Sequence, residues 1–217
     1  MNIQQIYERR FRSDREFRKN MWKILCKDFF QQYISEKDIV LEIGAGYCEF
    51  INNIRCGKKF AVDINPDINN YASNDVEVIL SKSDNIDSID TESIDVIFIS
   101  NLFEHLERHV IVDTVQEIFR ILKHGGKLVI LQPNIRFAYR DYWMFFDHIT
   151  PIDDRALVEL FKTKNFRITK IITKFLPFTT KGRLPKAMIL IRIYLTMKFL
   201  WLIFGRQSLI IAEKIRE

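Results

Sequence analysis

The sequence predicts an α/β protein built around a parallel, doubly wound sheet. Short apolar runs that indicate buried strands alternate with segments of helical periodicity, and the connections between them are short. The first run, Ile39–Ile43, is followed at once by Gly44 and Gly46, and then by a helical pattern through Phe50 and Ile54. Glycines at such a turn let the backbone approach a ligand where a side chain would collide, and the N-terminus of the following helix can bind an anion.

The elements that follow continue the same alternation. Later strands are expected at residues 60–63, 76–80, 94–99, 127–131, 166–174 and 208–212. Helices are expected from Pro66 over a short stretch, over 107–122 with Gly125 and Gly126 closing it, and over 153–164. Before the first strand, residues 2–35 are expected to form one or two amphipathic helices.

Composition places the chain among globular proteins. Its 217 residues, 47% hydrophobic and 28% charged, fit one domain with an ample core. The formal net charge of +5 is mild, and no basic block alternates with aromatic residues, so nucleic acid is not an expected partner. Cys26, Cys48 and Cys56 lack C-x-x-C spacing, which argues against a disulfide framework or a zinc site. The N-terminus lacks the apolar core of a signal peptide, so a cytoplasmic location is expected.

Asp63, at the end of the second strand, indicates a nucleoside site. An acid in this position, about twenty residues beyond a glycine turn, can accept hydrogen bonds from ribose hydroxyls. The dinucleotide fingerprint G-x-G-x-x-G would require glycine where this chain has Glu49, and a carboxylate there would repel a pyrophosphate. No phosphate-binding P-loop motif is present. The sequence therefore favours a nucleoside ligand that carries no pyrophosphate.

The stretch from Glu42 to Cys48 resembles motif I, [DE]-x-G-x-G-x-G, of class I S-adenosylmethionine (SAM)-dependent methyltransferases. Glu42, Gly44 and Gly46 match the motif, while Cys48 replaces its third glycine. The resemblance implies a Rossmann-like, seven-stranded, mostly parallel sheet with an antiparallel last strand and helices on both faces. It also implies SAM as the cofactor, held by Glu42, Gly44, Gly46, Asp63, Asp84, Asn85 and Asn101.

An aromatic segment follows the fifth strand. Its pattern, Q-P-N-x-R and then Y-W-x-x-x-D-H-x-T-P, resembles bacterial methyltransferases associated with polysaccharide or glycolipid assembly. Aromatic faces with a few polar groups suit a sugar acceptor, although the same rings would also form a core beneath a lid. The residues expected to bind the acceptor are Asn134, Arg136, Tyr142, Trp143 and Asp147.

The expected reaction is direct transfer of the sulfonium methyl group to a sugar or glycan hydroxyl. His148, which follows Asp147 in the sequence, is the first candidate for the general base, and His105 is the second. A structural His–Asp pair is an equally open interpretation. No metal is expected, because His105 and His109 frame Glu107 in an order that differs from H-E-x-x-H. Two other functions stay open: a catalytically silent cofactor-binding subunit and a nicotinamide-dependent oxidoreductase.

The chain is expected to form a single methyltransferase domain in four segments. Residues 1–36 are a helical cap, 37–175 the cofactor core and substrate loop, 176–206 a basic and apolar helical insertion, and 207–217 the last strand. Within the insertion, Arg192 and Lys198 would be costly inside a bilayer. Residues 181–206 are therefore expected to pack on the domain, to form a homodimer face or to lie at a membrane surface, and all three interpretations stay open.

Overall fold

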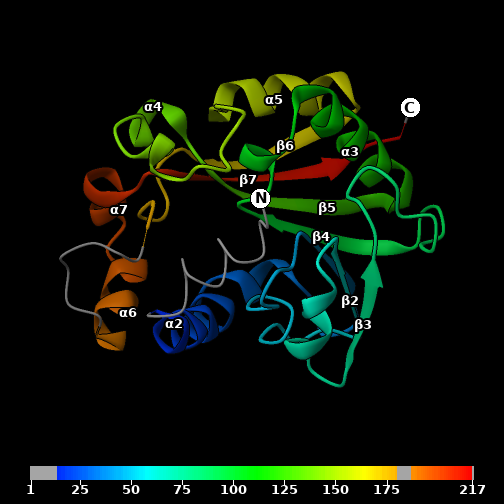
Figure 1. Cartoon of the computed structure of the whole chain (residues 1–217), viewed down its shortest axis with the longest axis horizontal. Coiled ribbons are helices and arrows are strands. Elements are labelled where there is room, and N and C mark those ends of the chain that lie inside the picture. Colours follow the sequence, from blue (N-terminus) through cyan, green and yellow to red (C-terminus); the bar gives the residue numbers. More distant parts are fainter. Residues whose placement is uncertain (1–13, 180–186, 217) are drawn as a thin grey trace.

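The computed structural model describes residues 14–179 and 187–216, and its centre is one seven-stranded sheet (Figure 1). The strands lie in the order β3-β2-β1-β4-β5-β7-β6. Their bounds are β1 Ile39–Ile43, β2 Lys58–Asp63, β3 Val76–Leu80, β4 Ile94–Ser100, β5 Leu122–Pro133, β6 Phe166–Ile172 and β7 Gln207–Lys214. Only β7 is antiparallel to its neighbours, β5 and β6. The predicted fold class is confirmed.

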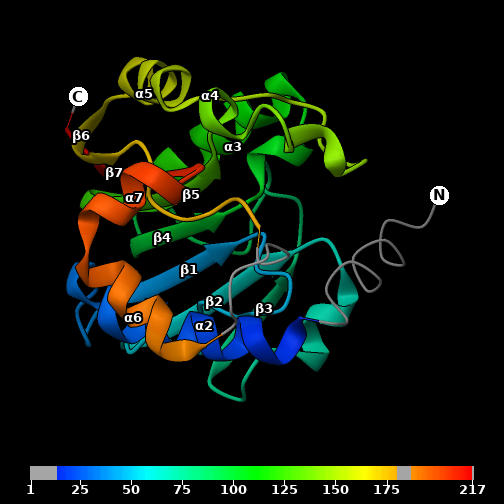
Figure 2. The same ribbon diagram turned by 90° about the vertical axis from the view of Figure 1, so that its left-hand side faces the viewer.

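Helices cover both faces of this sheet (Figure 2). One face carries α2 (Arg15–Asp28), the 3-10 helix η1 (Phe30–Tyr33), α6 (Met188–Thr196) and α7 (Lys198–Phe204). The other face carries α3 (Arg108–Ile121) and α5 (Asp154–Thr163). Because successive side chains of a strand point to opposite faces, Val40 joins the first hydrophobic cluster and its neighbour Leu41 joins the second.

Shorter helices lie in the connections. They are η2 (Pro66–Asn70), η3 (Phe103–His105), α4 (Ile135–Ala138) and η4 (Tyr142–Met144). Pro66 begins η2 as predicted, and Asn65 caps it by accepting a hydrogen bond from the Asp67 N–H. Residues 1–13 of the predicted N-terminal cap and residues 180–186 of the insertion, with its cations Lys181, Arg183 and Lys186, lie outside the described residues.

The helix predicted after the glycine turn is wrong. Residues 46–53 form consecutive turns, with hydrogen bonds from Cys48 N to Ala45 O at 2.7 Å and from Asn52 N to Cys48 O at 3.1 Å. Cys48 adopts a φ of +55°, in the left-handed region, which interrupts a right-handed helix at this point. The turns therefore keep the apolar side chains of this segment buried without a regular helix.

Gly125 and Gly126 do not close α3, contrary to prediction. Leu122 leaves the helix and already pairs with Ile94, and the next pair joins Lys127 to Val96, so residues 123–126 form a bulge in β5. A Cβ at Gly126 would come within 2.8 Å of the Lys123 carbonyl oxygen. The glycine is thus required by the close packing of the bulge.

The insertion before β7 forms two short helices in place of one. Met197, between α6 and α7, has a ψ of 78° and breaks the helical backbone. Over the described part of the chain, none of the helices combines the length and the apolar character needed to cross a bilayer. Trp201 of α7 nevertheless packs into the core beside Phe175, and Leu195 of α6 joins the same hydrophobic cluster.

A cluster of aromatic side chains joins α2 and η1 to the sheet. The Phe50 and Phe98 rings stack with centroids 3.6 Å apart. Trp22 and Phe30 approach Phe98 edge-on, with centroids 6.0 and 5.2 Å away. Such contacts add to the stabilisation that comes from burying the rings.

We expect Phe98→Ala to lower the free energy of unfolding by about 3–5 kcal/mol, because it removes the ring that this cluster shares and leaves a cavity. Urea denaturation followed by circular dichroism measures the change. Phe146→Ala is the matched control, since 77% of Phe146 is exposed, and should shift stability by less than about 0.5 kcal/mol. Equal losses in both variants would contradict the importance of the cluster.

Candidate active site

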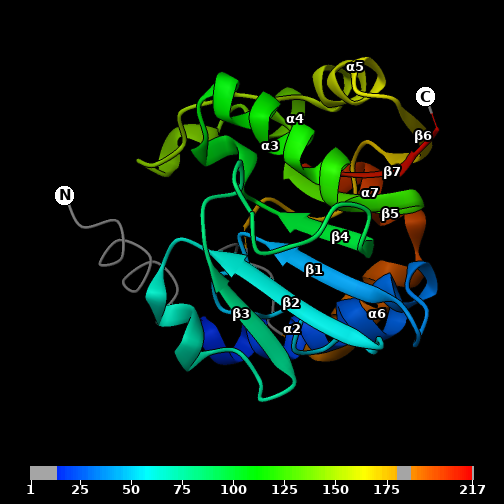
Figure 3. The same ribbon diagram turned by 90° about the vertical axis from the view of Figure 1, so that its right-hand side faces the viewer.

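The carboxyl ends of β1, β2 and β4 lie side by side along one edge of the sheet (Figure 3). Gly44 follows β1, Asp63 is the last residue of β2, and Asn101 follows β4. Open α/β sheets bind ligands beyond this edge, at the point where the strand order reverses. The order here reverses at β1, between β2 and β4, so this edge is the candidate site.

The glycine turn after β1 is held by the backbone of β2. Gly44 and Gly46 have φ values of +71° and +50°, and the Gly44 N–H donates to the Val62 carbonyl at 2.8 Å. A Cβ at Gly46 would have no atom within 4 Å, so the turn faces open space there. This open space is where the backbone can approach a ligand.

Asp63 is fixed at the tip of β2 by two backbone donors. Its Oδ2 accepts from the Gly46 N–H at 2.8 Å and its Oδ1 accepts from the Asn65 N–H at 2.9 Å. A carboxylate has about four acceptor sites, so two remain for hydroxyl donors. The acid is thereby oriented before any ligand binds.

Glu42 lies inside the protein and not at the open edge. Its side chain is buried, and its Oε2 accepts from the Ile51 N–H at 3.0 Å. Burial raises the pKa of this carboxyl well above its usual range, while the hydrogen bond from Ile51 acts in the opposite direction. Glu42 therefore supports the turns after β1 through its hydrogen bond with Ile51.

The loop after β3 carries Asp84 and Asn85. The Asp84 Oδ1 atom is buried and has no hydrogen-bond partner within the described residues, so it is available to a donor such as an amino group. The Asn85 carbonyl accepts from the Ser81 hydroxyl. Asn101, after β4, has a φ of +51° and its side-chain amide donates to the Ser100 hydroxyl at 2.8 Å.

Helix α2 lies against the glycine turn, a contact that the sequence analysis missed. Arg18 forms an ion pair with Glu49, and the Arg15 guanidinium lies 4.6 Å from the Tyr71 ring centroid and 5.4 Å from that of Tyr47. The cluster of arginines at the start of α2 was the available signal. These contacts join α2 to the edge of the sheet that forms the candidate site.

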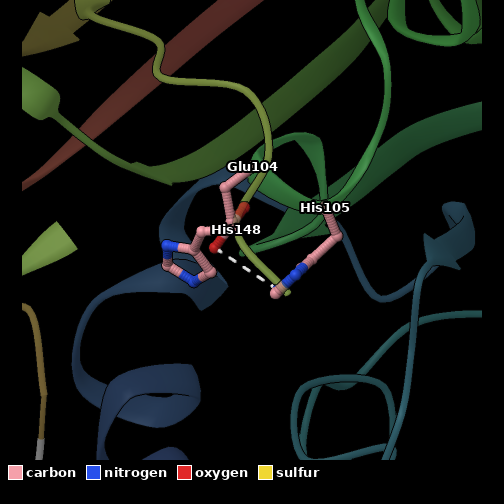
Figure 4. A group of neighbouring side chains, drawn as sticks. All are labelled: Glu104, His105 and His148. Atoms are coloured by element: carbon pink, nitrogen blue, oxygen red, sulfur yellow. Dashed lines mark ion pairs between the residues drawn. The ribbon is translucent and has the colours of Figure 1, made fainter. Parts of the chain in front are cut away.

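A second group of side chains lies beyond the end of β4. Glu104, His105 and His148 each place one potential ligand atom within 4.8 Å of the others (Figure 4). Glu104 is 1% exposed and His148 is 6% exposed. The His105 Nε2 lies 3.9 Å from Glu104 Oε1, and the two histidine rings meet edge-on with centroids 4.9 Å apart. The two histidines proposed as alternative bases therefore occupy one site.

Asp147 contacts His105. Its carboxylate Oδ2 lies 3.4 Å from His105 Nδ1, and its backbone carbonyl lies 3.0 Å from the same nitrogen. His148 packs instead among the rings of Tyr142, Phe145 and Phe178. The acid that precedes His148 in the sequence thus orients the other histidine.

The remaining residues predicted to bind an acceptor divide into buried and exposed ones. Asn134 is buried and donates to Asp154 Oδ1 at 2.8 Å, and buried Tyr142 donates to the Thr150 carbonyl at 2.5 Å, so both support the loop. Arg136 pairs with the same Asp154 oxygen at 3.0 Å. Trp143 is 58% exposed and is the one of these four residues that presents a large free face.

Comparisons with known proteins agree with this geometry. A family model described as a methyltransferase domain matches residues 41–130, the span from β1 to β5. Residues 41–130 therefore belong to a methyltransferase domain, and the strand order is that of the class I SAM-dependent methyltransferase fold. SAM is accordingly the cofactor, which sets the nicotinamide alternative aside. A search of curated proteins found no match.

Solved structures share the methyltransferase fold. A SAM-dependent methyltransferase from Archaeoglobus fulgidus has 20% identity and a TM-score of 0.70, over 94% of this chain and 99% of that one. One from Methanosarcina mazei has 16% identity and a TM-score of 0.62, over 87% and 97%. Geranyl diphosphate C-methyltransferase from Streptomyces coelicolor, solved with Mg²⁺, geranyl diphosphate and S-adenosylhomocysteine, has 12% identity and a TM-score of 0.61, over 87% and 78%.

Glu104 is the residue of the candidate site that sequence reasoning missed. It stands next to His105 in a segment that is otherwise apolar, Leu102-Phe103 before it and Leu106 after it. A carboxylate in such a segment, just past the end of a central strand, was the available signal. Its partners Gln132 and His148 come from distant parts of the sequence.

We expect Asp63→Asn to weaken binding of S-adenosylhomocysteine about ten- to a hundredfold, since hydrogen bonds to a charged group contribute about 1.5–3 kcal/mol. Isothermal titration calorimetry measures the affinity. Asp113→Asn, an exposed change on α3, is the matched control and should bind as the unmodified protein does. Unchanged affinity in Asp63→Asn would remove this residue from the cofactor site.

Proposed function

We propose that this methyltransferase transfers the SAM methyl group to a hydroxyl of a sugar or glycan. The observation that carries the proposal is the group of Glu104, His105 and His148 beyond β4, next to the strand ends that form the cofactor edge. Imidazole and carboxylate groups at such a position suit the removal of a hydroxyl proton. The proposal is specific for oxygen as the methylated atom.

Exposed aromatic rings beside this group support a sugar as the acceptor. Tyr139, Trp143 and Phe146 are 57%, 58% and 77% exposed, and all three belong to the segment between α4 and His148. Rings of this kind can stack on the C–H faces of a sugar, while nearby polar groups meet its hydroxyls. The segment is anchored at its base through buried Tyr142, so the exposed rings stand on a fixed support.

The chemistry asks little of the protein beyond alignment and proton removal. The sulfonium makes the methyl group a good electrophile, so the protein must align the hydroxyl oxygen, the methyl carbon and the sulfur, and exclude water. His148 is the first candidate to accept the hydroxyl proton and His105 the second. The rival is a catalytically silent cofactor-binding subunit, which would bind SAM at the same edge without turnover.

An apolar surface on α6 and α7 supports an acceptor held at a membrane. The large apolar residues exposed there are Ile189, Leu190, Ile193, Met197, Phe199, Leu202, Ile203 and Phe204. Lys198 lies on the same helices, and Lys174 donates to the Leu202 carbonyl at 2.9 Å. Apolar side chains bordered by cations suit an anionic bilayer surface. If the acceptor is a glycan linked to a lipid, binding of α6 and α7 to the bilayer would bring the protein to its acceptor.

We expect the protein to methylate a member of a panel of nucleotide sugars and lipid-linked glycans, detected by mass spectrometry as a gain of one methylene. His148→Ala should lower turnover on that acceptor by about a hundredfold or more, with S-adenosylhomocysteine affinity unchanged, since general acid–base groups contribute 10²–10⁴-fold, roughly. His109→Ala, on the exposed start of α3, should keep normal turnover. SAM binding without turnover on any acceptor would favour the silent subunit.

We expect the protein to sediment with vesicles that contain phosphatidylglycerol, and a Leu202→Glu, Ile203→Glu variant to lose about tenfold or more of this binding, because exposed apolar area no longer enters the interface. The matched control is Val112→Glu, at an exposed apolar position of α3 on the opposite face. A dimer in light scattering that the same double substitution dissociates, with no vesicle binding, would assign the surface to a homodimer.

A further inference from the structure

The group formed by Glu104, His105 and His148 has the donor set of a metal site. It offers one carboxylate oxygen and two imidazole nitrogens, all within 4.8 Å of one another (Figure 4). Two ligand atoms about 2.1 Å from one ion at a tetrahedral angle lie about 3.4 Å apart. The 3.9 Å between Glu104 Oε1 and His105 Nε2 would have to shrink by only about half an ångström.

His105 presents its Nε2 atom toward the Glu104 carboxylate. His105 Nδ1 lies 3.0 Å from the Asp147 backbone carbonyl, which can only accept a hydrogen bond. In the tautomer that donates from Nδ1 to this carbonyl, Nε2 is the nitrogen that can bind a metal, and it lies 3.9 Å from Glu104 Oε1 (Figure 4). A metal-bound histidine usually donates its other N–H to a carbonyl or carboxylate in this way.

Glu104 is a buried carboxylate whose neighbours are His105 and the Gln132 amide. Across residues 14–179 and 187–216, no lysine or arginine forms an ion pair with it. Its Oε2 accepts from the Gln132 amide at 2.7 Å, and its Oε1 faces His105 beyond hydrogen-bond distance. Burial raises the pKa of Glu104, while His105 and the hydrogen bonds that the carboxylate accepts act in the opposite direction. Buried carboxylates of this kind are commonly paired or bound to a metal.

The backbone holds the third ligand in place. The Glu104 carbonyl accepts from the Ile149 N–H at 2.8 Å and from the Thr150 N–H at 3.2 Å. The Thr150 hydroxyl in turn donates to the Leu106 carbonyl at 2.5 Å. These bonds fasten the segment that carries His148 to the turn that carries Glu104 and His105.

We propose that Glu104, His105 and His148 bind one divalent transition-metal ion, such as Mn²⁺ or Zn²⁺, through the carboxylate and the two imidazoles. Two imidazole ligands favour Zn²⁺ over Mg²⁺, which prefers oxygen ligands, and Mn²⁺ accepts a mixed set of nitrogen and oxygen ligands. The earlier expectation of no metal considered His105 with His109. The structure separates that pair between η3 and α3, and His109 is exposed.

The ion would act on the acceptor of the proposed function, and this consequence rests on that function. Three protein ligands leave coordination positions open for an acceptor hydroxyl, whose proton is released to water as the ion stabilises the alkoxide. The alkoxide oxygen then forms a bond to the methyl carbon, and the carbon–sulfur bond breaks with its electron pair on sulfur, which yields S-adenosylhomocysteine. His148 is then a ligand and not the base.

Metal binding is tested without an acceptor. The protein is first treated with EDTA to remove metal, and the EDTA is then removed. Calorimetry measures the binding of Mn²⁺ and of Zn²⁺, and electron paramagnetic resonance follows bound Mn²⁺. One ion per chain is expected, with affinity reduced about a hundredfold or more in Glu104→Gln and His148→Ala and about tenfold in Gln132→Ala. His109→Ala should bind normally. Glu104→Gln keeps the side-chain shape, and its thermal midpoint shows whether it folds.

The outcomes separate the metal site from the proposed function. No binding of either ion, or equal binding in folded Glu104→Gln and the unmodified protein, overturns the metal site. Glycan methylation that persists in EDTA overturns it too and leaves the proposed function intact. Stoichiometric binding that depends on Glu104, together with no turnover on any glycan, supports the site and overturns the proposed function. Turnover lost in EDTA and restored by Mn²⁺ or Zn²⁺ supports both.

Discussion

The parallel pairing of β1 with β2 and β4 is the constraint on which the rest of the site depends. Ile43 pairs with Val62 on one side and with Ile99 on the other, so the three strands end at the same level. Both faces of β1 are buried, and a slip of one residue would exchange the side chains that face the two hydrophobic clusters. The register is therefore fixed by packing, and it delivers the glycine turn and Asp63 to one edge of the sheet.

Glu104 connects this edge to residues 139–150, the segment proposed to hold the acceptor. Its backbone carbonyl holds the segment through Ile149 and Thr150, while its side chain reaches toward His105 and the Gln132 amide of β5. The same residue thus sets the position of the backbone and the chemistry of the group beyond β4. A site assembled in this way is preorganised, because its parts are held by buried hydrogen bonds before a substrate arrives.

Local patterns predicted the elements that local interactions decide. The continuous apolar run of β4 and the Pro66 start of η2 follow from the sequence alone. The turns after β1 could not be predicted from the sequence, because hydrophobic spacing gives no sign of the left-handed backbone at Cys48. The extra length of β5 comes from pairing of Leu122 with Ile94 of β4 at one end and of Gln132 and Pro133 with β7 at the other, and these partners are distant in the sequence. Contacts between Asp147 and His105 exist only once the whole sheet is assembled, so the adjacency of Asp147 and His148 suggested the wrong pair.

A divalent ion and a sulfonium can bind at the same end of the sheet only if nearby negative charges offset their repulsion. SAM carries a positive charge on sulfur, and a nearby cation would repel it at short range. Glu104 and Asp147 place two carboxylates around His105, so the proposed ion and its surroundings are close to neutral in sum. As the methyl group moves, the positive charge on sulfur declines and so does its residual repulsion from the ion. The electrostatic change therefore favours the transition state over the bound substrates, which is the condition under which binding energy accelerates a reaction.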